Sequence, residues 1–223
     1  MFPLRDNKRP SNFPAATWTL IIINILVFFW ETTLDKRSIE DAIKLYALVP
    51  RELLTAEAIS WQSRFLPLLT SLFLHGSLLH LALNLWTLHL FGDNVEDRMG
   101  VGRFIFFYIL CGLGSGIVHA VVFKNSSMPV IGASGAVSGV IAAYAFMYPG
   151  AKIITVIPII IIPYFIQIRA FFYIAVWFIA QILAGSQLGA AAGQENVAWW
   201  GHIGGFLTGF FIFWIFIHPE RSD

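Results

Sequence analysis

The chain has 223 residues, of which 57% are hydrophobic and only 12% are charged. A soluble domain carries about twice that share of charge, so the composition excludes a water-soluble globular fold. A net charge of +1 and the lack of a nucleic-acid motif exclude a nucleic-acid partner, and a single cysteine, Cys111, excludes an internal disulfide.

Long stretches without a charged residue indicate where the chain can cross a membrane. Each covers the roughly 20 residues that a helix needs to span a bilayer. They predict an all-α, polytopic membrane protein, a bundle of six transmembrane helices in one domain (15–218), between an N-terminal segment (1–14) and a tail (219–223). The expected spans are 15–33, 66–91, 103–123, 132–150, 169–188 and 198–217.

Positive charge predicts the orientation, because cytoplasmic loops are enriched in Lys and Arg. Arg5, Lys8 and Arg9 precede the first span and place the N-terminus in the cytoplasm, and alternation places the C-terminus there too. No small-residue cleavage site follows the first apolar run, so we interpret it as a retained helix. Without a transit-like leader, a prokaryotic plasma membrane is expected. In the first outer loop, an amphipathic pattern around 42–54 predicts a short surface helix.

One apolar segment, 153–168, is short for a span and contains Pro158 and Pro163. Each proline removes a backbone donor and clashes with the preceding helical turn. We interpret the segment as an apolar loop or half-helix at the cytoplasmic face that does not cross. The fourth and sixth spans then run in the same direction.

Polar side chains inside a membrane are costly and are therefore candidates for function. Ser134 lies in Gly132-Ala133-Ser134-Gly135, where the fourth span begins. Small neighbours allow close approach, and a helix N-terminus favours a developing negative charge, as a nucleophile requires. The alternative is a serine that hydrogen-bonds to a backbone carbonyl.

His202 lies near the start of the sixth span, and histidine is the usual general base for a serine. The alternative is a histidine held by a neighbouring helix. Small residues recur every four residues in both spans, which lets two membrane helices pack closely. We therefore expect Ser134 and His202 to come within hydrogen-bond reach. The small residues are Gly135, Gly139 and Ala143 in the fourth span and Gly201, Gly205 and Gly209 in the sixth.

The second span carries a third polar group. His80 and Asn84 are four residues apart and share a helix face, so both can donate to one point, as an oxyanion hole requires. The alternative is a hydrogen bond between helices. His75 is expected about 140° around this helix from His80, and His89 on roughly the opposite side, so these histidines do not converge on a metal. We interpret His89, His119 and His218 as packing or interface residues.

Taken together, these motifs resemble the rhomboid family of intramembrane serine proteases over nearly the whole chain. Each motif is loose alone, but their order and their placement in the spans are specific. The matching residues are His75, His80 and Asn84 (HxxxxHxxxN), Gly132 and Ser134 with Gly135 (GxSG), His202, Gly205 and Gly209 (HxxGxxxG), Glu96, Arg98 and Gly100 (ExRxG), and Trp61 with Arg64.

The resemblance implies a minimal six-helix protease that cleaves membrane-spanning proteins within or beside their helices. Ser134 would be the nucleophile and His202 the general base. His80, Asn84 and the backbone N–H of Ser134 would bind the oxyanion. The family uses no third acidic member, no metal and no cofactor.

The resemblance also implies structural roles. Glu96 and Arg98 would brace a cytoplasmic loop, and the fifth span with the loop Gly189–Ala198 would form a lateral gate and cap. Two features depart from the family. Trp61 and Arg64 are not adjacent, and Ser138 stands where some members place an aromatic ring under the histidine.

Two other functions compete with this interpretation. One is a catalytically inactive relative that binds membrane clients, against which the intact Ser134, His202 and Asn84 argue. The other is a six-span transporter or channel. Transporters usually carry charged residues along an intramembrane path and often show two-halves symmetry. The uncharged stretches show neither feature, so a protease is favoured; the oligomeric state is not predicted.

Overall fold

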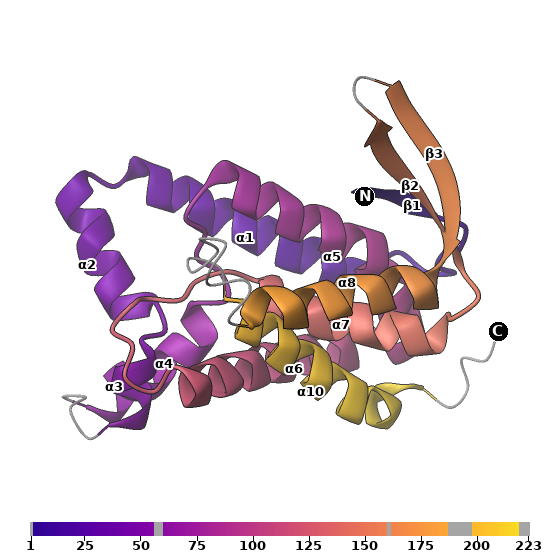
Figure 1. The fold of residues 1–223 in the computed structure, drawn as a ribbon. Coiled ribbons are helices and arrows are strands. Elements are labelled where there is room, and N and C mark those ends of the chain that lie inside the picture. Colours follow the sequence, from indigo (N-terminus) through magenta and orange to yellow (C-terminus); the bar gives the residue numbers. More distant parts are fainter. Residues whose placement is uncertain (1, 56–59, 160–161, 187–197, 219–223) are drawn as a thin grey trace.

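The computed structural model describes residues 2–55, 60–159, 162–186 and 198–218, and helices dominate it (Figure 1). The elements in chain order are β1 (Phe2–Asp6), α1 (Ala15–Thr33), α2 (Lys36–Tyr46), α3 (Pro50–Leu54), α4 (Trp61–Thr70), α5 (Leu78–Met99), α6 (Val101–Val122), α7 (Ser134–Met147), β2 (Lys152–Ile159), β3 (Ile162–Arg169), α8 (Ala170–Gly185) and α10 (Trp199–Phe216).

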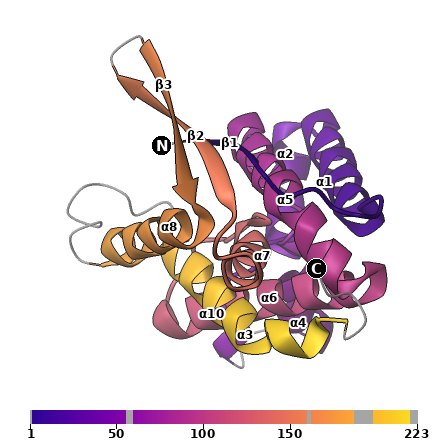
Figure 2. The same ribbon diagram turned by 90° about the vertical axis from the view of Figure 1, so that its right-hand side faces the viewer.

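The bundle is built around α7, which packs against α5, α6, α8 and α10 (Figure 2). Residues Gly135–Ala145 of α7 are all buried. Among the described residues, α1, α6 and α10 are long and apolar enough to cross a membrane, whereas α7 and α8 are apolar but shorter. The chain is therefore a polytopic membrane protein with a mostly helical fold.

The central helix α7 is shorter than a membrane is thick. The 14 residues of α7 rise by about 21 Å, whereas the hydrocarbon core of a bilayer is about 30 Å thick. The two ends of α7 therefore cannot both reach a membrane surface. Because other helices pack around α7, a polar group at the start of this helix can lie inside the bundle and away from lipid.

The predicted second span, 66–91, has the wrong bounds. This stretch contains two helices, α4 and α5, separated by a turn over residues 71–77. The side chain of Ser77 begins α5 by accepting a hydrogen bond from the backbone N–H of His80 at 3.2 Å. The turn residues carry no charge, so the absence of charge could not reveal the break.

The segment after α1 also differs from the prediction of one short helix around 42–54. Two helices, α2 and α3, lie there, and Pro50 is the first residue of α3. Between them, the backbone of Leu48 forms an isolated β-bridge with Val130. This extended pairing interrupts the helical pattern.

The segment 153–168 forms neither a loop nor a half-helix. It folds into an antiparallel hairpin of β2 and β3, and β1 adds a third strand beside β2. The strands are rich in isoleucine, which favours extended backbone. Lys152 pairs with Arg169, so both ends of the hairpin meet at one place. That the segment does not cross the membrane stays a prediction. The hairpin extends away from the helices (Figure 1).

The N-terminal strand is attached to the bundle by polar and aromatic contacts. The indole N–H of Trp86 donates to the carbonyl of Pro3 at 2.7 Å, and the Trp86 ring stacks on Phe2. The carboxylate of Asp6 accepts a hydrogen bond from the hydroxyl of Tyr144. Burial raises the pKa of the Asp6 carboxyl above its ordinary value, and the hydrogen bond from Tyr144 opposes this rise.

Two buried glutamates attach α1 to the site-bearing helices. Both carboxylate oxygens of Glu96 accept from backbone N–H groups, of Ala16 and Thr17, at 2.8 Å each. These N–H groups open α1 and have no intrahelical acceptor, so the carboxylate satisfies them. Glu31, near the other end of α1, accepts from the backbone N–H of His75. The helix α1 thus contains a buried glutamate, Glu31, which the uncharged stretches did not show.

The remaining motif residues outside the site have structural contacts. Gly100 has φ 81°, a left-handed value that suits glycine, and it joins α5 to α6. The carbonyl of Arg98 accepts the backbone N–H of His218 at 2.9 Å. Arg64 donates to the carbonyl of Leu53 at 2.7 Å. In contrast, the Trp61 side chain is exposed.

Candidate active site

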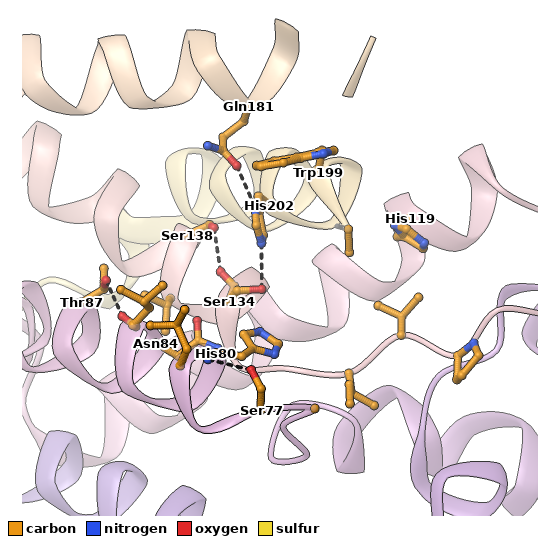
Figure 3. Close-up of a pocket in the computed structure, with 18 of the residues that line it drawn as sticks. Ser77, His80, Asn84, Thr87, His119, Ser134, Ser138, Gln181, Trp199 and His202 are labelled. Atoms are coloured by element: carbon orange, nitrogen blue, oxygen red, sulfur yellow. Dashed lines mark hydrogen bonds between the residues drawn. The ribbon is translucent and has the colours of Figure 1, made fainter. Parts of the chain in front are cut away.

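The predicted contact between Ser134 and His202 is confirmed. Ser134 is the first residue of α7, and His202 lies in the first turn of α10. The Oγ atom of Ser134 lies 2.8 Å from Nε2 of His202, within hydrogen-bond distance (Figure 3). Both side chains are half-buried. A serine hydroxyl in this position can pass its proton to the imidazole nitrogen.

The glycines hold this contact in place. A Cβ atom added at Gly205 would overlap the backbone carbonyl of Gly135, and one at Gly209 would overlap that of Gly139. The helices α7 and α10 therefore touch backbone to backbone, as the small-residue stripes predicted. The close approach brings the first turns of both helices together, and with them Ser134 and His202.

The second ring nitrogen of His202 also has a partner. Its Nδ1 lies 2.7 Å from Oε1 of Gln181, which projects from α8 (Figure 3). Gln181 is only 6% exposed. Gln181 is not among the site residues predicted from the sequence. Its signal was an amide in the middle of an apolar span, which is a candidate for function by default.

Aromatic rings from two elements enclose the imidazole of His202. The ring of Trp177 in α8 stacks against it with centroids 6.3 Å apart, and the ring of Trp199 meets it edge-on at 5.8 Å. Ser138, which the resemblance placed near the histidine, instead donates its hydroxyl to the carbonyl of Ser134 at 2.7 Å. Trp177 thus supplies an aromatic ring beside the histidine from a different helix.

His80 and Asn84 lie on the side of Ser134 that is opposite to His202 (Figure 3). Their shared helix face predicted that they would lie together. The loop before α7 runs directly past them. A Cβ atom at Gly132 would lie 2.6 Å from Cε1 of His80 and 3.8 Å from Nδ2 of Asn84. Gly132 has φ 123°, which also favours glycine at this position. The backbone two residues before Ser134 can therefore pass against both side chains.

The expected place of His75 is wrong. The helix begins only at Leu78, so His75 lies in the preceding turn and a helical angle does not apply. Its Nε2 lies 3.1 Å from Nδ2 of Asn84, and its Nδ1 lies 3.2 Å from the carbonyl of Phe73. These contacts assign the proton to Nδ1 and make Nε2 the acceptor. His75 thereby orients the amide of Asn84.

One cavity of about 730 Å³ is lined by His80, Asn84, Ser134, Trp177, Gln181 and His202. It is lined from α5, α7, α8 and α10, and His119 of α6 also lines it rather than only packing. Of the predicted cap, Ala198 lines the cavity, whereas residues 189–197 lie outside the described residues.

A helical membrane bundle with a serine and a histidine facing one internal cavity defines the class of this protein. Residues 62–219 match the Rhomboid domain, and the chain belongs to the rhomboid family. Family membership supports intramembrane proteolysis in general.

Three relatives show the range of that family. RHOMBOID-like protein 4 of Arabidopsis thaliana is 30% identical over 160 residues, 69% of this chain and 34% of the relative. Rhomboid protease GluP of Bacillus subtilis (strain 168) is 27% identical over 198 residues, 89% of this chain and 34% of the relative. Inactive rhomboid protein 1 of Drosophila melanogaster is 37% identical over 76 residues, 34% of this chain and 5% of the relative. The chain spans about a third of the length of the first two relatives.

Proposed function

We propose that this protein is an intramembrane serine endopeptidase that cleaves membrane-spanning protein substrates within or next to the membrane. Ser134 is the nucleophile and His202 the general base of a Ser–His dyad. The observation that supports this most directly is the 2.8 Å distance between Ser134 Oγ and His202 Nε2 inside a cavity. An inactive family member that only binds clients would not need this contact.

The reaction proceeds through an acyl-enzyme. Ser134 Oγ attacks the scissile carbonyl carbon while its proton moves to Nε2 of His202. The tetrahedral intermediate collapses when His202 gives this proton to the leaving amine and the C–N bond breaks. Water, deprotonated by His202, then attacks the ester carbonyl and releases Ser134 with its proton restored.

The oxyanion is stabilised by donors on the opposite side of Ser134 from His202. We assign this role to His80, Asn84 and the backbone N–H of Ser134, which lies in the first turn of α7. First-turn N–H groups lack intrahelical acceptors and carry the positive end of the helix dipole. Because His75 already accepts one hydrogen of the Asn84 amide, the other can point to the oxyanion.

The substrate enters as unwound chain rather than as helix, because a helical peptide bond is shielded by its own hydrogen bonds. Entry past α8 is consistent with that helix lining the cavity. We propose further that the site opens toward the outer side of a prokaryotic plasma membrane and that both termini are cytoplasmic. The support for this orientation is the positive charge of Arg5, Lys8 and Arg9 ahead of α1.

Labelling with a fluorescent fluorophosphonate tests the dyad without a known substrate. The purified protein in detergent is expected to form one adduct, which peptide mapping assigns to Ser134. Labelling should disappear in Ser134→Ala. It should persist in Ser126→Ala, which is the matched control because Ser126 lines the same cavity, whereas His202 contacts Ser134. An adduct that survives Ser134→Ala would refute the assignment of the nucleophile. A folded wild type that neither reacts with the probe nor cleaves a membrane-spanning reporter would instead indicate an inactive relative.

Removal of one oxyanion donor should have a smaller effect than removal of the dyad. Asn84→Ala is expected to lower kcat by about 10²–10³-fold, equivalent to about 2.7–4 kcal/mol. The measurement is the rate of cleavage of a reporter with a single membrane-spanning helix. Thr87→Val, one turn away at the same cavity wall, is the control and should retain its rate. Equal rates for Asn84→Ala and this control would exclude Asn84 from the oxyanion hole.

A further inference from the structure

Gln181 lies beside the ring nitrogen of His202 that does not contact Ser134. A neutral imidazole carries one N–H, and only the other nitrogen can accept a proton. For Nε2 to accept the proton of Ser134, the imidazole hydrogen must be on Nδ1. Oε1 of Gln181 lies 2.7 Å from this Nδ1, where it can accept that hydrogen.

The orientation of the amide is itself fixed by a second contact. Nε2 of Gln181 donates to the carbonyl of Trp177, one turn earlier in α8, at 3.4 Å. With the NH₂ group turned to this carbonyl, Oε1 faces His202. A flipped amide would present a donor to Nδ1, move the imidazole hydrogen to Nε2 and leave the Ser134 proton without an acceptor. The observed orientation is the one compatible with catalysis.

The helix α8 fixes the plane of the imidazole as well as its proton. Trp177 and Gln181 are four residues apart, so they share one face of α8. The Trp177 ring stacks on His202 at an interplanar angle of 30°, and Gln181 meets the edge of the same imidazole. Burial of Gln181 limits the access of water that could replace its oxygen.

We infer that Gln181 is a positioning residue that holds His202 in the Nδ1–H tautomer and in line with Ser134. The inference rests on the proposed function, because it assigns a role in the same dyad. The acceptor is a neutral amide, so it orients the base without adding a negative charge to the apolar interior. The effect should appear in kcat rather than in KM, because Gln181 acts through His202 and not on the bound chain.

Gln181→Leu and Gln181→Glu separate orientation from packing. The leucine variant keeps the apolar part of the side chain and loses the acceptor, whereas the glutamate variant keeps an acceptor. We expect Gln181→Leu to lower kcat by roughly 10–100-fold with KM unchanged, by analogy with histidines that lose their orienting partner in metal sites. Gln181→Glu should recover most of this loss. Gln167→Leu, at an exposed position of β3, controls for the substitution and should match the wild type.

The tautomer can be read without any cleavage. In protein with ¹⁵N-labelled histidine, the His202 signal, identified by its loss in His202→Ala, should report Nδ1–H in the wild type and in Gln167→Leu. A mixture of tautomers in Gln181→Leu would support the inference even if no substrate is cleaved, so its outcome is separate from that of the proposed function. An unchanged tautomer in Gln181→Leu, or a kcat equal to that of Gln167→Leu, would overturn it.

Discussion

His202→Ala is expected to lower kcat for a membrane-spanning reporter by about 10⁵–10⁶-fold, comparable to the loss of a triad histidine in a soluble serine protease. Without Nε2, the hydroxyl of Ser134 has no acceptor for its proton, and the leaving amine has no donor. Substrate binding relies on the cavity walls, so KM should change little. The measurement is kcat and KM in detergent micelles or proteoliposomes.

His89→Ala is the matched control for this prediction. His89 lies in α5, where its ring contacts Trp18 rather than the cavity. This variant should cleave at the rate of the wild type, and both proteins should unfold at similar temperatures. If His202→Ala kept more than a few per cent of the wild-type kcat, another group would have to be the base.

Gly205→Val is expected to abolish fluorophosphonate labelling of Ser134, although Gly205 does not itself take part in the Ser134–His202 contact. A side chain at this position would overlap the backbone carbonyl of Gly135, which cannot move as a flexible side chain can. The helices α7 and α10 must separate, which breaks the contact between Ser134 and His202. We expect the free energy of unfolding to fall by about 3 kcal/mol, the upper end of the range for overpacked cores. Thermal unfolding and fluorophosphonate labelling of the same preparation measure both effects.

Gly102→Val provides the comparison for this substitution. Gly102 lies near the start of α6, and a Cβ atom there would meet nothing within 4 Å. Both variants replace a helical glycine with the same β-branched residue, so the comparison separates the steric overlap at Gly205 from the effect of the valine side chain itself. Full labelling of Gly205→Val would contradict the view that backbone contact between α7 and α10 assembles the dyad.

The sequence predicted the dyad because its geometry is encoded in small residues. Glycines on both helices let the two backbones touch, namely Gly135 and Gly139 on α7 and Gly205 and Gly209 on α10. This contact places Ser134 and His202 at a similar depth in the bundle. The shared face of His80 and Asn84 is equally a property of helical spacing. These features depend on the local sequence and on one pair of helices.

The features that the sequence did not predict depend on more distant partners. The turn over residues 71–77 contains no charge and no strong breaker at its start, so it resembled the spans beside it. The β2–β3 hairpin gains a third strand from Phe2–Asp6, which is far away in sequence. The role of Gln181 depends on how α8 packs onto α10. No local sequence pattern predicts the contact between Gln181 and His202. The only local signal was a polar side chain in an apolar span.

The two halves of the dyad lie 68 residues apart in the chain, on helices α7 and α10. During biosynthesis, Ser134 therefore enters the membrane well before its base does. A nascent chain that has inserted α7 alone holds an ordinary, unreactive serine. Under the proposed function, the serine becomes reactive only when α10 docks against the glycines of α7 and brings His202 to it, so completion of the fold is the step that activates the protein.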